Sequence, residues 1–435
     1  MTDNTIDKLI DGMATEDISV NRAVLSNGLR FVHHQMPDTS MVTLNVLYNV
    51  GARDERPDMT GIAHLFEHMM FGGSANVEDF DGLLTKAGGV SNAWTSNDFT
   101  NFHLTAPAHN AETLFYLESD RMLAPTLTEQ VLNVQRSVVI EEFKQQCLNI
   151  PYGNLMHTLR PLMYGSHPYS WPVIGKDFES IAAITRHDIT EWWTNHYSPD
   201  NAVLAVAGNI DYESALKFAK RWFEDIPSRS QSVRQHSPLD PVSNGVTQTV
   251  YGAVPATLIV VAYRMGAYDS DQYYAADAIT DILSMGQASR FAQRINMNPD
   301  SPLVDADASI SGAKDPGMLM LTARLADENV DIDYAIRFLV EAARSIINEG
   351  IRTEELQRLK NRQRASFVFG NMASVSCAQT IAEAEMHGHS PGYKLRRYNT
   401  LTCESIIDAA IDIFDSTHPV TVIYRPINPN SQSFQ

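Results

Sequence analysis

The sequence predicts an α+β protein with two homologous domains, each a mostly antiparallel sheet with helices packed on one face. The chain has 435 residues, which is more than a single hydrophobic core usually holds. Its composition, 44% hydrophobic and 20% charged, is that of a globular protein. Its two halves also repeat one order of strands and helices, which predicts two copies of one fold.

The first half opens with a predicted β-hairpin. Asn27-Gly28 is a strong two-residue turn signal between expected strands at Ala23–Ser26 and Leu29–Gln35. An apolar strand follows at Val42–Val50. The next segment is an apolar helix around His64-Leu65-Phe66-Glu67-His68, and the glycine pair after it predicts the helix end.

The second half repeats this order. The apolar strand Leu258–Tyr263 precedes a helix through Ala278–Met285, as Val42–Val50 precedes the histidine-containing helix. When the two copies are aligned, Ala278, Asp281 and Ile282 stand where the first half has His64, Glu67 and His68. The later matches between the copies are Thr128–Leu132 with Thr353–Gln357, Ile184–Ile189 with Leu401–Ile406, and the strand Ala202–Ala207 with Val420–Tyr424.

The repeat fixes the predicted domain boundaries. We expect a first domain with the histidine-containing helix at 1–226, an exposed linker rich in Ser and Pro at 227–244, and a repeat domain without these histidines at 245–435. The second domain is expected to begin with the strand Val246–Tyr251.

The net charge of −19 makes nucleic acid and anionic membranes poor partners and favours neutral or basic peptides. The three widely spaced cysteines do not suggest a disulfide framework. The N-terminal segment Met1–Lys8 lacks a basic start and an apolar run, and no stretch of the chain approaches eighteen uninterrupted apolar residues. A cytoplasmic location without membrane insertion is therefore expected, or a periplasmic one if a leader was trimmed.

The segment from His64 to His68 carries the predicted chemistry. Residues four apart project from the same helix face, so His64 and His68 can bind one zinc ion. Glu67 lies close enough to act as a general base on a water molecule. The order His-x-x-Glu-His is that of the inverted zinc peptidases.

A hydrolytic zinc site usually has a third protein ligand. The best candidate segment is the predicted helix Gln135–Phe143, where Glu141 and Glu142 lie about 100° apart, so one of them can face the site. Glu142 follows Val138 and Val139, which are expected on the inner face. Helical periodicity alone leaves both glutamates open. Cys147 and His157 are further alternatives without supporting spacing.

The chain resembles the pitrilysin/insulinase-type inverzincins, specifically the half-length branch that includes mitochondrial processing peptidase. The resemblance covers nearly the whole chain. Besides the histidine motif, the segments similar to that family are Gly88–Thr95, Arg136–Glu142, Pro151-Tyr152-Gly153, His167-Pro168-Tyr169, Ile174-Gly175 and Tyr197–Ala202.

The resemblance implies a role for each matching residue. It makes His64, His68 and Glu142 the ligands of Zn²⁺ and Glu67 the base. It places Asn92 and Ala93 on an edge strand to which a peptide substrate adds as a further strand. It also implies that two chains or halves enclose a chamber, in a homodimer or in a heterodimer with a homologous subunit.

Two positions depart from the family pattern. Better-known members have an acidic residue seven positions before the third ligand, where this chain has Gln135, which can hydrogen-bond in the shell around the ligands but carries no charge. Many members have an Arg and a Tyr in the second half that hold the substrate carbonyl. Around Ser289–Arg294 no Tyr completes that pair, so a partner subunit could supply the missing groups.

The function expected is that of a zinc metalloendopeptidase, EC 3.4.24 type, acting on peptides or unfolded polypeptides inside an enclosed chamber. One alternative is a catalytic subunit that requires a homologous partner chain. Another is a structural or regulatory subunit of the same fold, and a zinc-stabilised binding module is a third.

Overall fold

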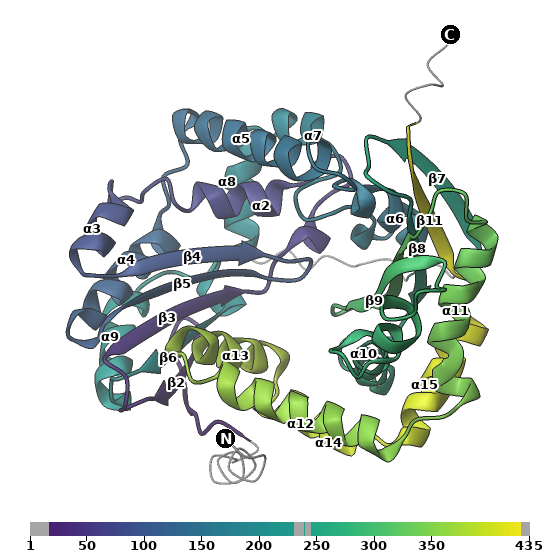
Figure 1. The fold of residues 1–435 in the computed structure, drawn as a ribbon. Coiled ribbons are helices and arrows are strands. Elements are labelled where there is room, and N and C mark those ends of the chain that lie inside the picture. The colour runs from purple at the N-terminus through teal and green to yellow at the C-terminus, as the bar shows by residue number, and fades with distance from the viewer. Residues whose placement is uncertain (1–16, 230–238, 240–244, 428–435) are drawn as a thin grey trace. The chain divides into compact units, whose positions relative to one another are not determined.

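The structure is a computed structural model that describes residues 17–229, 239 and 245–427 (Figure 1). The chain divides into two compact units, each assembled from separate stretches of sequence. The first unit comprises Met1–Phe143, Trp171–His236 and Arg364–Arg396, and the second comprises Lys144–Ser170, Ser237–Gln363 and Arg397–Gln435, as far as these are described. The predicted N-terminal segment and most of the predicted linker 227–244 lie outside the described residues.

The first unit contains a six-stranded sheet in the order β1-β2-β6-β3-β5-β4. Its strands are β1 (Asn21–Val24), β2 (Arg30–Gln35), β3 (Met41–Tyr48), β4 (Val90–Thr95), β5 (Thr100–Pro107) and β6 (Ala202–Gly208). All neighbours are antiparallel except β2 and β6. The pairing of β1 with β2 confirms the predicted hairpin.

The second unit contains a five-stranded sheet in the order β7-β11-β8-β10-β9. Its strands are β7 (Val246–Gly252), β8 (Leu258–Arg264), β9 (Leu303–Ser311), β10 (Met318–Leu325) and β11 (Val420–Pro426). Only β7 and β11 are parallel. This order matches β2-β6-β3-β5-β4 strand for strand, including the parallel pair, so the internal repeat and the mostly antiparallel α+β fold are confirmed.

The helices are divided between the two units. The first unit contains α2 (Ile62–Met69), α3 (Phe80–Lys86), α4 (Ala111–Leu123), α5 (Glu129–Phe143), α7 (Phe178–Ala183), α8 (Arg186–His196), α9 (Tyr212–Phe223) and α13 (Ser374–His387). The second contains α6 (Leu155–Tyr164), α10 (Asp271–Ser284), α11 (Ile332–Asn348) and α15 (Cys403–Ser416). The boundary between the units falls within α12 (Thr353–Gly370) and within α14 (Tyr393–Thr400). Among the described residues, no helix is long and apolar enough to span a membrane.

Both faces of the first sheet are covered. Phe31 on β2 contacts Tyr212 of α9, with ring centroids 6.3 Å apart. Its neighbour Val32 points to the opposite face, because side chains alternate along a strand. On that face Val32, Leu47 and strand β6 form a buried cluster with α13, through Cys377, Ala378, Ile381 and Ala382. The sequence predicted helices on one face of the sheet, and the structure adds α13 on the opposite face.

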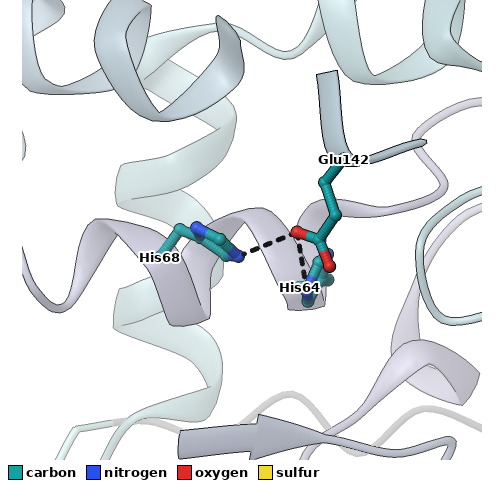
Figure 2. A group of neighbouring side chains, drawn as sticks. All are labelled: His64, His68 and Glu142. Carbon is teal, nitrogen blue, oxygen red and sulfur yellow. Dashed lines mark ion pairs between the residues drawn. The ribbon is translucent and has the colours of Figure 1, made fainter. Parts of the chain in front are cut away.

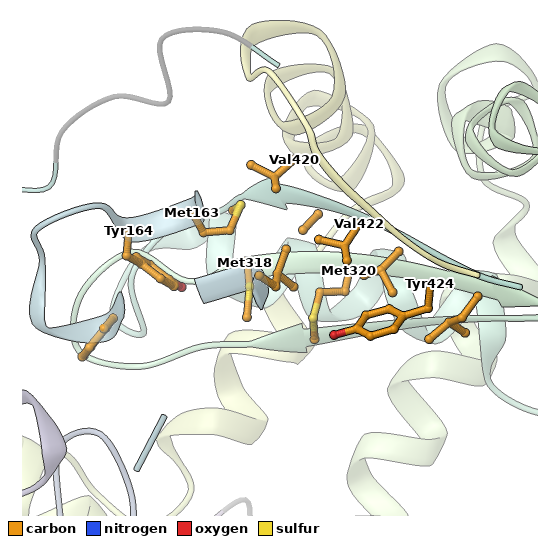
Figure 3. Packing of buried hydrophobic residues seen from close by; sticks show 12 residues of the cluster. Met163, Tyr164, Met318, Met320, Val420, Val422 and Tyr424 are labelled. Carbon is orange, nitrogen blue, oxygen red and sulfur yellow. The ribbon is translucent and has the colours of Figure 1, made fainter. Parts of the chain in front are cut away.

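The second sheet is covered in the same way by α6. Leu159, Met163 and Tyr164 pack against Val260, Met318, Met320, Val422 and other residues of β8, β10 and β11 (Figure 3). In sequence α6 follows α5, as α13 follows α12. The second unit therefore takes α6 from the first half of the sequence, and the first unit takes α13 from the second half. The predicted domains, with contiguous boundaries at 226 and 245, do not include this exchange.

Candidate metal centre

Helix α2 presents the histidine motif from a largely buried position. Ile62, Ala63, Leu65, Phe66 and Met69 are all fully buried. Phe66 packs against the ring of Tyr197, with centroids 4.3 Å apart, which fixes the rotation of the helix. The apolar positions thus hold one face of the helix in the core, and the polar positions of the motif are left on the other.

The two histidines converge on Glu142 from α5 (Figure 2). The Oε2 atom of Glu142 lies 3.5 Å from Nε2 of His68 and 3.9 Å from Nε2 of His64. The imidazole rings of His64 and His68 are nearly perpendicular, with centroids 4.8 Å apart. Nitrogen and carboxylate ligand atoms thus surround one point, where α2 and α5 meet.

The structure distinguishes the two adjacent glutamates. Glu141 is exposed, whereas the side chain of Glu142 is 29% exposed and belongs to the three-residue group with His64 and His68. Part of our argument for Glu142 was wrong, because Val138 is exposed and only Val139 is buried. At the end of α5, Phe143 packs against Phe178 of α7 and anchors the turn that carries Glu142.

The spacing of these three side chains suits a zinc ion. Tetrahedral zinc with bonds of about 2.0–2.2 Å holds its ligand atoms roughly 3.4 Å apart. The measured separations of 3.5 and 3.9 Å are close to that value and too long for good hydrogen bonds. One ligand atom from each residue lies within 4.8 Å of the other two. The residues therefore fit the metal that the sequence predicts.

Burial shifts the pKa values of two side chains at this centre, His64 and Glu67. Burial, together with the neighbouring His68 ring, lowers the pKa of His64 and so favours the neutral ring, the form that binds a metal. Burial raises the pKa of Glu67, and a hydrogen bond from Thr95 opposes that rise. The Thr95 hydroxyl donates to Oε2 of Glu67 at 2.5 Å.

Thr95 ends β4, the strand at the edge of the first sheet. Asn92 is exposed and Ala93 half-buried on this strand, and β5 is the one described strand that pairs with it. The Ser96 N–H donates to Phe99 O, and because the ladder bonds of an antiparallel pair alternate, the N–H of Ala93 points away from β5. It donates to the Asn92 side chain at 2.9 Å. If the Asn92 side chain moves aside, the N–H of Ala93 can donate to the backbone of a further strand at this edge.

The other residues singled out in the sequence have different surroundings. Gln135 is half-buried on α5, two helical turns before Glu142. Cys147 and His157 belong to the second unit and are not in the group of possible ligands found among the described residues. Arg290 is buried in an ion pair with Glu355 at 2.9 Å, so its guanidinium group is already engaged in the core of the second unit.

The counterpart of the metal centre in the second unit contains an ion pair. Asp281 on α10, which stands at the position of Glu67, accepts a hydrogen bond from Nε of Arg362 at 2.9 Å. The histidine positions are Ala278 and Ile282, both buried and apolar. The acidic residue of this helix thus pairs with the cation of Arg362, and its two neighbours at the histidine positions offer no ligand for a metal.

The sequence matches two models of one peptidase family. Residues 30–163 match Insulinase (Peptidase family M16), and residues 183–363 match the Peptidase M16 inactive domain. The metal centre is formed by residues within the first match, and the Asp281–Arg362 pair lies within the second.

Relatives of similar length support the same assignment. The chain is 26% identical to the zinc protease PqqE of Helicobacter pylori, over 92% of each protein. It is 23% identical to the mitochondrial-processing peptidase subunit beta of Saccharomyces cerevisiae, over 86% of this chain and 83% of that one. A crystal structure of a protease from Helicobacter pylori superposes with a TM-score of 0.87 at 25% identity, covering 94% of this chain and 100% of the other. The chain therefore belongs to the M16 family of peptidases.

Proposed function

We propose that this protein is a zinc-dependent metalloendopeptidase that hydrolyses peptides or unfolded polypeptides, with Glu67 as the general base. The observation that carries this proposal is the convergence of His64, His68 and Glu142 at separations of 3.5 and 3.9 Å. Relatives such as PqqE are named zinc proteases, which agrees with it.

The chain's own residues supply the binding and the proton transfers. His64, His68 and Glu142 would hold Zn²⁺, which when bound lowers the pKa of a water molecule and polarises a carbonyl group. Glu67 takes a proton from the water that attacks the peptide carbonyl carbon. It then gives this proton to the nitrogen that leaves as the C–N bond breaks, so the products are a carboxylate and an amine.

Two features of Glu67 suit this cycle. Its side chain is only 8% exposed, and burial raises its pKa towards the range where a carboxylate both accepts and returns a proton. The hydrogen bond from Thr95 orients the carboxylate by one oxygen and leaves the other available. Thr95 therefore links the base to the edge strand β4.

We further propose that a substrate segment pairs with the edge of β4 near Asn92 and Ala93. Main-chain pairing accepts many sequences, because each residue of the substrate contributes the same N–H and C=O groups. An extended or unfolded polypeptide meets this requirement, whereas a folded domain has its backbone groups already paired.

A partner subunit is a second part of the proposal. Arg290 is occupied by Glu355 and Ser345 in the core of the second unit, so it is not free to hold a substrate carbonyl. A relative in Saccharomyces cerevisiae is itself described as a subunit. We propose that a second, homologous chain completes the catalytic chamber, in a homodimer or a heterodimer.

The test uses purified protein with its zinc content measured, and a mixed peptide library as substrate. Glu67→Gln is expected to retain zinc and lose activity by about a thousandfold, because it removes the base but no ligand. Glu142→Gln should lose zinc, and the matched control Glu141→Gln, an exposed neighbour on the same helix, should keep both zinc and activity. Full activity in Glu67→Gln would refute the mechanism.

The partner proposal has its own readout. Weak hydrolysis by the chain alone that rises when a homologous chain is added supports a heterodimer, and sedimentation analysis of the active species identifies a homodimer. Stoichiometric zinc without hydrolysis in every assembly would favour a structural or regulatory subunit over an enzyme.

A further inference from the structure

Glu55 is a fully buried carboxylate close to the metal helix that takes no part in the mechanism above. It follows a short 3₁₀ turn, Ala52–Asp54, which lies between β3 and α2. A buried carboxylate is costly unless its oxygens accept hydrogen bonds, so its retention in the core calls for a structural reason.

The Glu55 side chain caps the start of α2. One oxygen accepts the N–H of Gly61 and the other accepts the N–H of Ala63, each at 3.0 Å. The first N–H groups of a helix have no partners within the helix, and the two side-chain oxygens of Glu55 supply acceptors for two such groups. Gly61 has no side chain that could do this, and the helix begins immediately after it at Ile62.

The conformation of Gly61 also makes a capping side chain at position 61 unfavourable. It has φ +89°, a conformation that glycine adopts readily, and an added Cβ would lie 3.0 Å from the carbonyl oxygen of Ile174. A capping Ser or Asp at this position would therefore be strained. The cap has to come from elsewhere in the chain, and Glu55 provides it.

The turn that carries Glu55 is itself fixed to the loop after β4. The Ala52 N–H donates to Ser96 O at 3.1 Å, and the Arg53 N–H donates to Asn97 O at 2.8 Å. Arg53 also forms an ion pair with Asp98 at 3.1 Å. The first turn of α2 is thus tied, through Glu55, to the segment that follows Thr95.

We propose that Glu55 is a positioning residue of the metal centre, which holds the first turn of α2 and thereby fixes the direction in which His64 points. His64 is the third residue of α2, so it lies within the turn whose N–H groups Glu55 binds. His68 lies one turn later and is held by the packing of Phe66 and Met69. Loss of the cap would displace one ligand relative to the other two.

This inference rests on the proposed zinc site, so the experiment measures metal binding instead of hydrolysis. Zinc affinity is measured by competition with a chromogenic chelator, and ligand geometry by the visible absorption of the Co²⁺ form. We expect Glu55→Gln to weaken zinc binding about tenfold, in the range found when groups that orient metal ligands are removed, and to change the Co²⁺ spectrum. The matched control is Glu355→Gln, which alters a buried carboxylate in the second unit and should leave both readouts unchanged.

The possible results separate the proposed function from the positioning role of Glu55. If the wild-type protein binds no zinc, the proposed function fails. If it binds zinc and Glu55→Gln binds equally well with the same Co²⁺ spectrum, the positioning role is refuted. If Glu55→Gln does not fold by circular dichroism, Glu55→Asp keeps the carboxyl group on a shorter side chain, and an unchanged affinity in that variant refutes the inference as well.

Discussion

Replacing Ile381 on α13 by alanine tests the exchange of helices between the two halves of the chain. Ile381 is 1% exposed and packs with Val32, Leu47 and residues of β6 in the first unit, although it lies in the second half of the sequence. The change removes about three methylene equivalents, worth roughly 0.8 kcal/mol each, and leaves a cavity. We expect a loss of about 3 kcal/mol in the stability of the first unit.

Native-state hydrogen exchange localises this loss, because it reports the opening free energy of individual strands. Amides of β2, β3 and β6 should lose protection in Ile381→Ala, and amides of β8 and β10 should keep it. The control is Ile411→Ala on α15, whose side chain is 40% exposed and which should change stability by less than about 0.5 kcal/mol. Loss of protection confined to β8 and β10, or equal effects of the two substitutions, would refute the packing described for α13.

Three further predictions follow from the site and the second unit. Ala93→Pro should raise the KM for peptides about tenfold with little change in kcat, since its N–H bonds the Asn92 side chain and an edge proline removes no bond to β5; an unchanged KM would refute pairing at β4. Dialysis against a chelator should remove one zinc ion per chain and abolish hydrolysis, and zinc should restore it; metal analysis giving two ions per chain would contradict a single centre. Burial raises the pKa of Glu355, but hydrogen bonds from Arg290 and Arg352 outweigh it and hold the pKa at about 2. Stability of the second unit should therefore fall as pH drops from about 4.5 to 2, by up to roughly 3 kcal/mol, and this slope should be absent in Glu355→Gln.

The sequence was most informative where a local pattern determines the structure. The Asn27-Gly28 turn, the helix spacing of His64 and His68, and the repeated order of strands all depend on neighbours along the chain, and the fold that they predict is confirmed. Periodicity could not separate Glu141 from Glu142, because α5 is packed on a narrow face and exposes Val138 as well as Glu141.

Residues that act across the fold had no such signal. Thr95 bonds Glu67 from a strand 28 positions away, and Glu55 bonds Gly61 and Ala63 through a turn whose shape depends on the loop after β4. Their partners are set by tertiary contacts, which a single sequence does not encode as a spacing. The exchange of α6 and α13 was missed for the same reason, since an amphipathic helix does not identify the sheet it covers.

The exchange of helices makes each unit depend on both halves of the sequence. In the second unit Asp281 pairs with Arg362, and the buried residues Ala278 and Ile282 stand at the two histidine positions. The second half of the sequence also supports the first unit, because it contributes helix α13, which covers Val32, Leu47 and Ala205 of the first sheet. Without α13 this apolar face would meet water, at a cost of about 25 cal/mol for each Å² exposed. The apolar residues at the histidine positions of α10 therefore remove no support from the first unit, whereas removal of the second half of the sequence would uncover one face of its sheet.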